Sequence, residues 1–83
     1  MLAITLNDGV LFMESLELKI FREVAKAGSI SKAAENMNYV QSNITAHIKK
    51  LEKELNSILF VRHNKGITLT SEGEKLLFLS LIH

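Results

Sequence analysis

The stretch SKAAENMNYVQSNITAHIKK, which runs from Ser31 to Lys50, decides the fold. Ser31 is a good helix cap, and the residues after it predict a short helix through about residue 37. A turn at residues 38–39 leads into a second predicted helix, at about residues 41–55. Four apolar side chains of that helix fall within about 60° of one another and are expected to face a core: Ile44, Ile48, Leu51 and Leu55.

The opposite face of the second predicted helix is small and polar at its start and basic further along. No acid occurs from Val40 to Ile48. Small polar side chains at a helix start allow close approach to base-pair edges, and the helix dipole there favours phosphate. We therefore expect this helix to enter a groove of DNA. The candidate contact residues of this motif are Ser31, Gln41, Ser42, Asn43, Thr45 and Lys49.

The segments on either side are expected to support this motif. Ser15 and Gly28 mark the start and the end of a first helix, at about residues 16–27. After the motif, residues 59–62 and 67–70 predict two short strands joined by a turn in which Gly66 can take a positive φ. A hairpin in this place is a wing, and its Arg62, His63 and Lys65 suit a phosphate or a minor groove.

The last predicted helix, capped by Thr70, is apolar nearly all round. Such a helix needs burial on several sides, and a second copy of the chain could cover one of them. The chain ends at His83 without a cap or a glycine, which favours a helix cut short. The candidate dimerisation residues are Leu76, Leu77, Phe78, Leu81 and Ile82.

Composition narrows the other possibilities. The 83 residues allow one small domain, and the absence of Cys excludes disulfides and thiolate metal sites and fits a cytoplasmic protein. The three His residues have no metal-ligand spacing, so we expect neither metal nor cofactor. No stretch is long enough to span a membrane. Without paired carboxylates, a nucleophile–base pair or a phosphate-binding glycine loop, an enzyme is not expected.

Residues 1–12 fit the rest poorly. LAITL, an Asn7-Asp8-Gly9 turn signal and VLF resemble a small hairpin. Because an isolated hairpin is marginal in water, a disordered extension ahead of Met13 is the favoured interpretation. Both alternatives leave a DNA-binding unit at residues 13–70 and a truncated linker helix at 71–83.

Four blocks of the sequence, over about residues 13–83, resemble the DNA-binding domain of LysR-type transcriptional regulators. Their order and spacing make the resemblance more specific than a helix-turn-helix pattern alone. The residues that carry it are Leu18, Phe21, Val24, Gly28, Ser29, Ala33, Ala34, Gln41, Ser42, Thr45, Ile48, Leu51, Glu52, Leu59, Phe60, Arg62, Leu69, Thr70 and Gly73.

The resemblance implies a winged helix-turn-helix, mainly α with one small hairpin, followed by a linker helix that pairs two subunits. It implies that Gln41 faces the major groove and that Thr45 and Arg62 contact the DNA backbone. With the acid-free helix start and the basic wing, we expect sequence-specific binding of double-stranded DNA by a homodimer, whose two-fold symmetry predicts an inverted-repeat site. The family's effector-sensing domain has no counterpart in these residues, so no small-molecule effector is expected to bind them.

Four residues depart from the family pattern. Val40 replaces a capping Ser or Thr, and such a loss costs about 1 kcal/mol. Asn43 adds an amide that could read adenine, and Ala46 removes a common Arg or His. Asn56 replaces a Gly and tolerates the left-handed conformation.

These departures keep a second function open, a protein-interaction module of the same fold that dimerises without binding DNA. Alternatives also remain for single residues. Arg62 could pair with Glu72 or Glu74, and His47 could pack beside the core stripe or face solvent.

Overall fold

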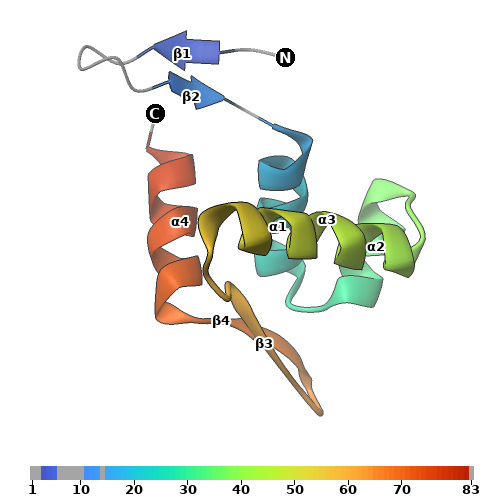
Figure 1. Cartoon of the computed structure of the whole chain (residues 1–83). Coiled ribbons are helices and arrows are strands. Elements are labelled where there is room, and N and C mark those ends of the chain that lie inside the picture. Colours follow the sequence, from blue (N-terminus) through green and yellow to red (C-terminus); the bar gives the residue numbers. More distant parts are fainter. Residues whose placement is uncertain (1–2, 6–10, 14, 83) are drawn as a thin grey trace.

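The computed structural model describes residues 3–5, 11–13 and 15–82. The described residues fold as a winged helix-turn-helix, mainly α with a small hairpin as the wing, as predicted (Figure 1). In chain order its elements are β1 (Ala3–Thr5), β2 (Leu11–Met13), α1 (Leu16–Ala27), α2 (Ile30–Met37), α3 (Gln41–Leu55), β3 (Phe60–His63), β4 (Gly66–Leu69) and α4 (Ser71–Leu81).

One core joins α1, α2 and α3 to the wing. Ala33 and Ala34 are buried and small, so α2 can approach its neighbours closely. The rings of Phe21 and Phe60 lie 5.3 Å apart and connect α1 to β3. Of the predicted stripe on α3, Leu55 is 46% exposed and lies outside the core. The largest fully buried side chains are Phe21, Ile20, Ile44, Leu59 and Val24.

The helix starts follow the sequence signals, with one correction. Ser15 and Thr70 cap α1 and α4 as predicted, by accepting hydrogen bonds from Leu18 N and Gly73 N. The prediction that Ser31 caps α2 was wrong. Ser29 has the extended backbone of a cap, with φ −160° and ψ 147°, and its Oγ accepts from Lys32 N at 2.9 Å. Because the extended Ser29 directly follows Gly28, α2 begins at Ile30 and Ser31 already lies in its first turn.

The wing is an antiparallel hairpin that is anchored to the corner between α1 and α2. Each strand is displaced by one residue from its predicted bounds, and Phe60 pairs with Leu69. Ile67 N donates to Gly28 O at 3.2 Å. Gly66 has φ 136°, and a Cβ there would come within 2.5 Å of the same carbonyl oxygen. Glycine therefore permits both the turn and the close approach.

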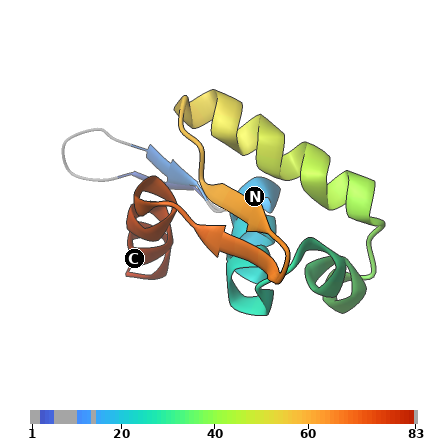
Figure 2. The ribbon, with the colours of Figure 1, turned by 90° about the horizontal axis from the view of Figure 1, so that it is seen from below.

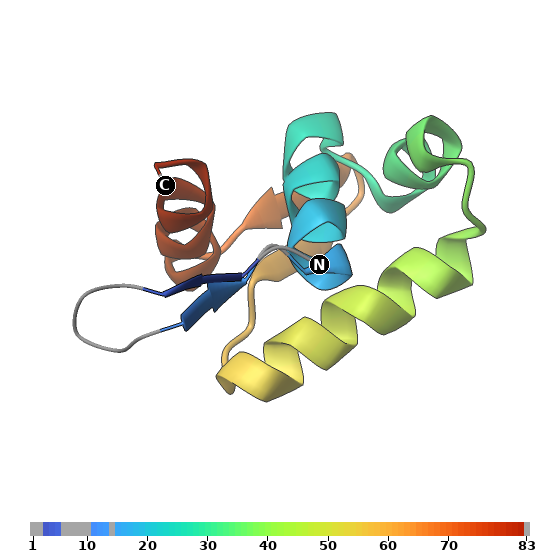
Figure 3. The same cartoon turned by 90° about the horizontal axis from the view of Figure 1, so that it is seen from above.

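Helix α4 packs beside α1 on the side of the domain away from α3 (Figure 3). Its start is fixed to the α3–β3 loop because Thr70 Oγ1 donates to Ile58 O at 2.6 Å. Seen from below, the β3–β4 hairpin lies between α4 and α2 (Figure 2). Leu76 and Leu77 pack partly against the core, while Phe78, Leu81 and Ile82 are exposed. The predicted dimerisation residues are therefore divided between the domain's own core and its surface.

Ahead of α1, β1 pairs antiparallel with β2, with Ala3 opposite Met13. The predicted turn at Asn7-Asp8-Gly9 lies outside the described residues. The choice between a disordered extension and a hairpin, and the predicted boundaries at residues 12 and 70, stay predictions.

Candidate nucleic-acid interface

The start of α3 presents an exposed polar surface. Gln41, Ser42 and Asn43 are exposed in its first turn, which contains no acid. Thr45 is half-buried one turn along, and Lys49 is exposed after that. The predicted contact residues of this helix therefore follow one another along the accessible surface.

Arg62 joins the wing to this surface. Its Nη2 donates to Thr45 Oγ1 at 3.3 Å, and not to either glutamate of α4. Two surface depressions, each of about 230 Å³, share Arg62 in their lining. Ser31 and Gln41 also line one of them, and Thr45 and Lys49 line the other. The fold thus brings five predicted residues together around Arg62, close to the turn of the wing.

The remaining predicted residues lie outside these depressions. Ser42 and Asn43 are exposed along α3. Lys65 is exposed in the turn between β3 and β4, where its backbone N donates to His63 Nδ1 at 3.3 Å. Basic residues therefore lie in β3, where Arg62 contacts α3, and in the turn of the wing.

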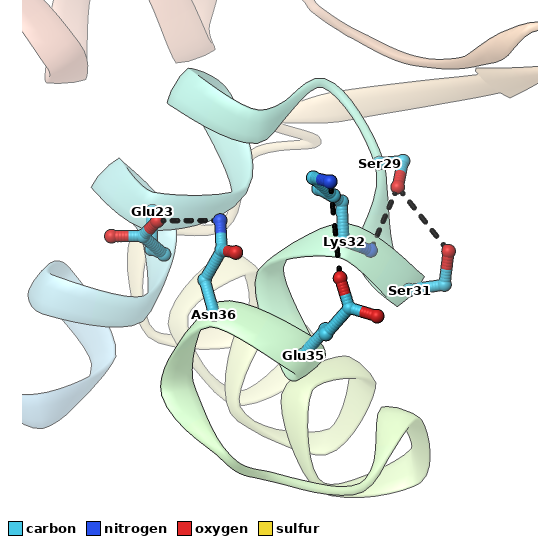
Figure 4. A network of polar contacts seen from close by, with 6 residues as sticks. All are labelled: Glu23, Ser29, Ser31, Lys32, Glu35 and Asn36. Atoms are coloured by element: carbon cyan, nitrogen blue, oxygen red, sulfur yellow. Dashed lines mark hydrogen bonds and ion pairs between the residues drawn. The ribbon is translucent and has the colours of Figure 1, made fainter.

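Polar contacts around α2 hold Ser31 at the edge of this surface (Figure 4). The Oγ atoms of Ser31 and the capping Ser29 lie 3.4 Å apart. At the other end of α2, Asn36 Nδ2 donates to Glu23 Oε2 of α1 at 3.3 Å. The first contact is local to the start of α2, and the second ties α2 to α1.

A polar cluster formed by Glu17, His47 and Lys50 ties α3 to α1, and the sequence did not predict it. Glu17 Oε2 lies 3.0 Å from His47 Nδ1 and 3.5 Å from Lys50 Nζ. Burial raises the pKa of Glu17, but the hydrogen bonds from His47 and from its own backbone, with the charge of Lys50, bring that pKa below its ordinary value. The ionised carboxylate therefore stabilises the packing of α3 on α1.

Glu52 provides a second attachment that the sequence did not predict. Its Oε2 accepts a hydrogen bond from Leu59 N at 2.8 Å, which fixes the loop between α3 and β3. Asn56 ends α3 in the left-handed conformation, as predicted, with φ 51°. The second half of α3 is thus attached to both α1 and the α3–β3 loop.

Other kinds of site find little support. Within the described residues, no three His, Asp or Glu side chains gather in a way that could hold a metal ion. No helix in the same part of the chain is both long and apolar enough to cross a membrane.

Comparison with known proteins identifies the family. The family model described as bacterial regulatory helix-turn-helix protein, lysR family, matches residues 16–74. The chain belongs to the LysR family. This match confirms the resemblance drawn from the four sequence blocks, and it includes α1 to α3, the wing and the first turn of α4.

Curated LysR-like relatives are named as transcriptional regulators. The HTH-type transcriptional regulator CzcR of Bacillus cereus is 58% identical over 65 residues, 78% of this chain and 23% of the relative. YofA of Bacillus velezensis is 55% identical over 76 residues, 86% of this chain and 26% of the relative. The chain therefore spans about a quarter of the length of these relatives.

Solved LysR-family structures have the same fold. The crystal structure of CbnR, a LysR family transcriptional regulator, has a TM-score of 0.78 at 37% identity, covering 82% of this chain and 24% of that chain. The CbnR_DBD–DNA complex has a TM-score of 0.77 at 37% identity, covering 82% of this chain and 78% of that one. The BenM_DBD complex with benA site 1 DNA has a TM-score of 0.77 at 29% identity, covering 83% and 80%.

Proposed function

We propose that this LysR-family domain binds double-stranded DNA sequence-specifically, as the DNA-reading part of a cytoplasmic transcriptional regulator. The observation that carries the proposal is the contact between Arg62 and Thr45, which joins the wing to the acid-free start of α3. Similar LysR domains are named as DNA complexes among the solved structures. The joined surface offers polar groups for bases beside positive charge for phosphates.

We propose that phosphate contacts and base contacts are made by different residues. Arg62, Lys65 and Lys49 are exposed cations that suit phosphates, and Ser31 can add a hydroxyl donor. The side chains of the first turn of α3 suit base edges, where a good bidentate pair gives about 1–3 kcal/mol of discrimination. The residues proposed for base readout are Gln41, Ser42, Asn43 and, beside its contact to Arg62, Thr45.

We also propose that α4 pairs two copies of the chain. Phe78, Leu81 and Ile82 are 64%, 64% and 59% exposed, and Leu79 beside them is 55% exposed. Burial of these side chains against a second copy would remove apolar surface from water. A two-fold dimer would present two α3 helices to an inverted-repeat site, with half-sites spaced by helical turns.

The test is selection of duplexes from a random pool, followed by titration of the selected and a scrambled duplex across salt concentrations. We expect the protein to prefer the selected duplex and its affinity to fall steeply with salt. Arg62→Ala should weaken both duplexes similarly, whereas Gln41→Ala should relax preference at one base position. Lys26→Ala is the matched control, because it removes an exposed charge from α1, outside the two depressions that Arg62 lines.

Equal affinity for both duplexes at every salt concentration would refute sequence-specific binding. Absence of binding at low salt, together with a dimer in sedimentation, would support the interaction module instead. The exposed apolar side of α4 is the observation that keeps this second function in the test.

A further inference from the structure

Val40 is an apolar residue in a position that favours a polar one. The other helices of the described residues begin with Ser15, Ser29 and Thr70, and each side chain accepts a hydrogen bond from a backbone N–H. Val40 has a similar extended backbone, with φ −82° and ψ 152°, but makes no side-chain cap. The first turn of α3 therefore lacks a stabilising contact that the other helices have.

Val40 is not part of the hydrophobic core either. Its side chain is 68% exposed, more than that of any other large apolar residue in the described part of the chain. The neighbouring Tyr39 packs partly against the core, and Ile44 in the next turn is fully buried. Val40 thus contributes neither a cap nor core burial, although it lies directly beside Gln41 at the start of the helix.

We propose that Val40 is a specificity residue that contacts the 5-methyl group of a thymine. This inference rests on the proposed DNA binding and adds one base to what α3 reads. The thymine methyl is the apolar group that a base pair displays in the major groove, and apolar side chains recognise it. The N-terminal residues of a recognition helix are those that reach base edges, and Val40 presents two methyl groups there.

Uridine substitution tests this contact without changing base pairing. Each thymine of the selected duplex is replaced singly by 2′-deoxyuridine, which removes only the methyl group. We expect one position in each half-site to weaken wild-type binding by about fourfold, which corresponds to the roughly 0.8 kcal/mol of one buried methyl-sized group. Val40→Ser should bind the thymine and uridine forms of that position equally, because it lacks the valine methyl groups.

A stability measurement and a control variant distinguish loss of the methyl contact from damage to the fold. Val40→Ser introduces a capping side chain, so its melting temperature should rise while its discrimination of uridine disappears. Val61→Ser is the matched control, because it makes the same replacement at an exposed valine of β3 but keeps Val40, and it should retain the full uridine effect.

Two results would overturn the inference. One is a wild-type protein that binds every uridine-substituted duplex as tightly as the unmodified one. The other is a Val40→Ser variant that keeps the wild-type uridine effect. A protein that shows no preference for the unmodified selected duplex over the scrambled one would instead contradict the proposed function, and this comparison is measured first.

Discussion

The two halves of α3 are held in different ways. Its first turn begins at Val40 without a side-chain cap, and the next three side chains are exposed. Its second half is attached to α1 through Lys50, whose Nζ lies 3.5 Å from Glu17 Oε2, and to the α3–β3 loop through Glu52, and it ends at a left-handed Asn56. The helix is therefore fixed through its second half, whereas the first turn, although Ile44 beneath it is buried, leaves its polar side exposed on the surface that we propose to meet DNA.

On this account the second half of α3 positions the helix, and its first turn recognises DNA. A recognition helix must keep its angle to the wing, because both have to reach the same duplex. Fixed contacts in the second half can supply that angle, while the first turn keeps its polar groups for a partner. The substitutions below test the division, from the largest expected effect to the smallest.

Ile44→Ala should have the largest effect on stability. Ile44 is fully buried beneath the first turn of α3, and truncation of such a side chain typically costs about 2–5 kcal/mol. Ser42→Ala on the exposed side of the same turn should change the free energy of unfolding by no more than about 0.5 kcal/mol. Urea denaturation of both variants measures the difference. Equal losses would mean that the exposed side also holds the fold together.

Glu52→Ala should have a smaller but clear effect. It removes the acceptor of the partly buried Leu59 N, and an unsatisfied buried donor costs about 1–3 kcal/mol. Glu52→Gln keeps an acceptor oxygen and should recover much of the loss. Urea denaturation again gives the comparison. If both variants unfold at the wild-type urea concentration, Glu52 does not anchor the second half of α3.

Glu17 should make the attachment of α3 to α1 sensitive to acid. Its pKa in the folded state lies below the ordinary value of 4.5, so its contribution is present above that value and is lost as pH falls through the lower folded pKa. Glu17→Gln should show a smaller loss of stability in this pH window. The exposed Glu54→Gln should follow the wild type. Urea denaturation between neutral and acidic pH measures the three curves, and identical curves for wild type and Glu17→Gln would contradict the stabilising role.

Local signals were enough to predict most of the fold. Ser15, Gly28 and Thr70 mark helix ends through bonds or torsions that involve only nearby residues, so the sequence locates them well. The cap of α2 was misplaced because two serines lie two residues apart, and it is Ser29 that has the extended backbone and accepts the bond from Lys32 N. The exposure of Leu55 was missed because helical periodicity gives the direction of a side chain but not where the neighbouring elements end.

The residue types of the candidate site could be predicted from the sequence, but the contacts between its side chains could not. The acid-free start of α3 and the basic wing are visible in the sequence. The contact between Arg62 and Thr45 spans 17 residues, and the one between His47 and Glu17 spans 30. Such pairs depend on how α1, α3 and the wing pack together, which no local pattern encodes. The roles of the individual residues toward DNA stay predictions.

Chemical-shift mapping by NMR tests most directly whether the open half of α3 and the wing form the DNA-reading surface. The backbone amide signals of the protein are followed while the selected duplex is added. We predict that the largest shifts fall at residues 40–45 and 62–66, with smaller shifts on the outer side of α4. Shifts concentrated on α1 or α4, with the start of α3 unchanged, would contradict the proposed interface.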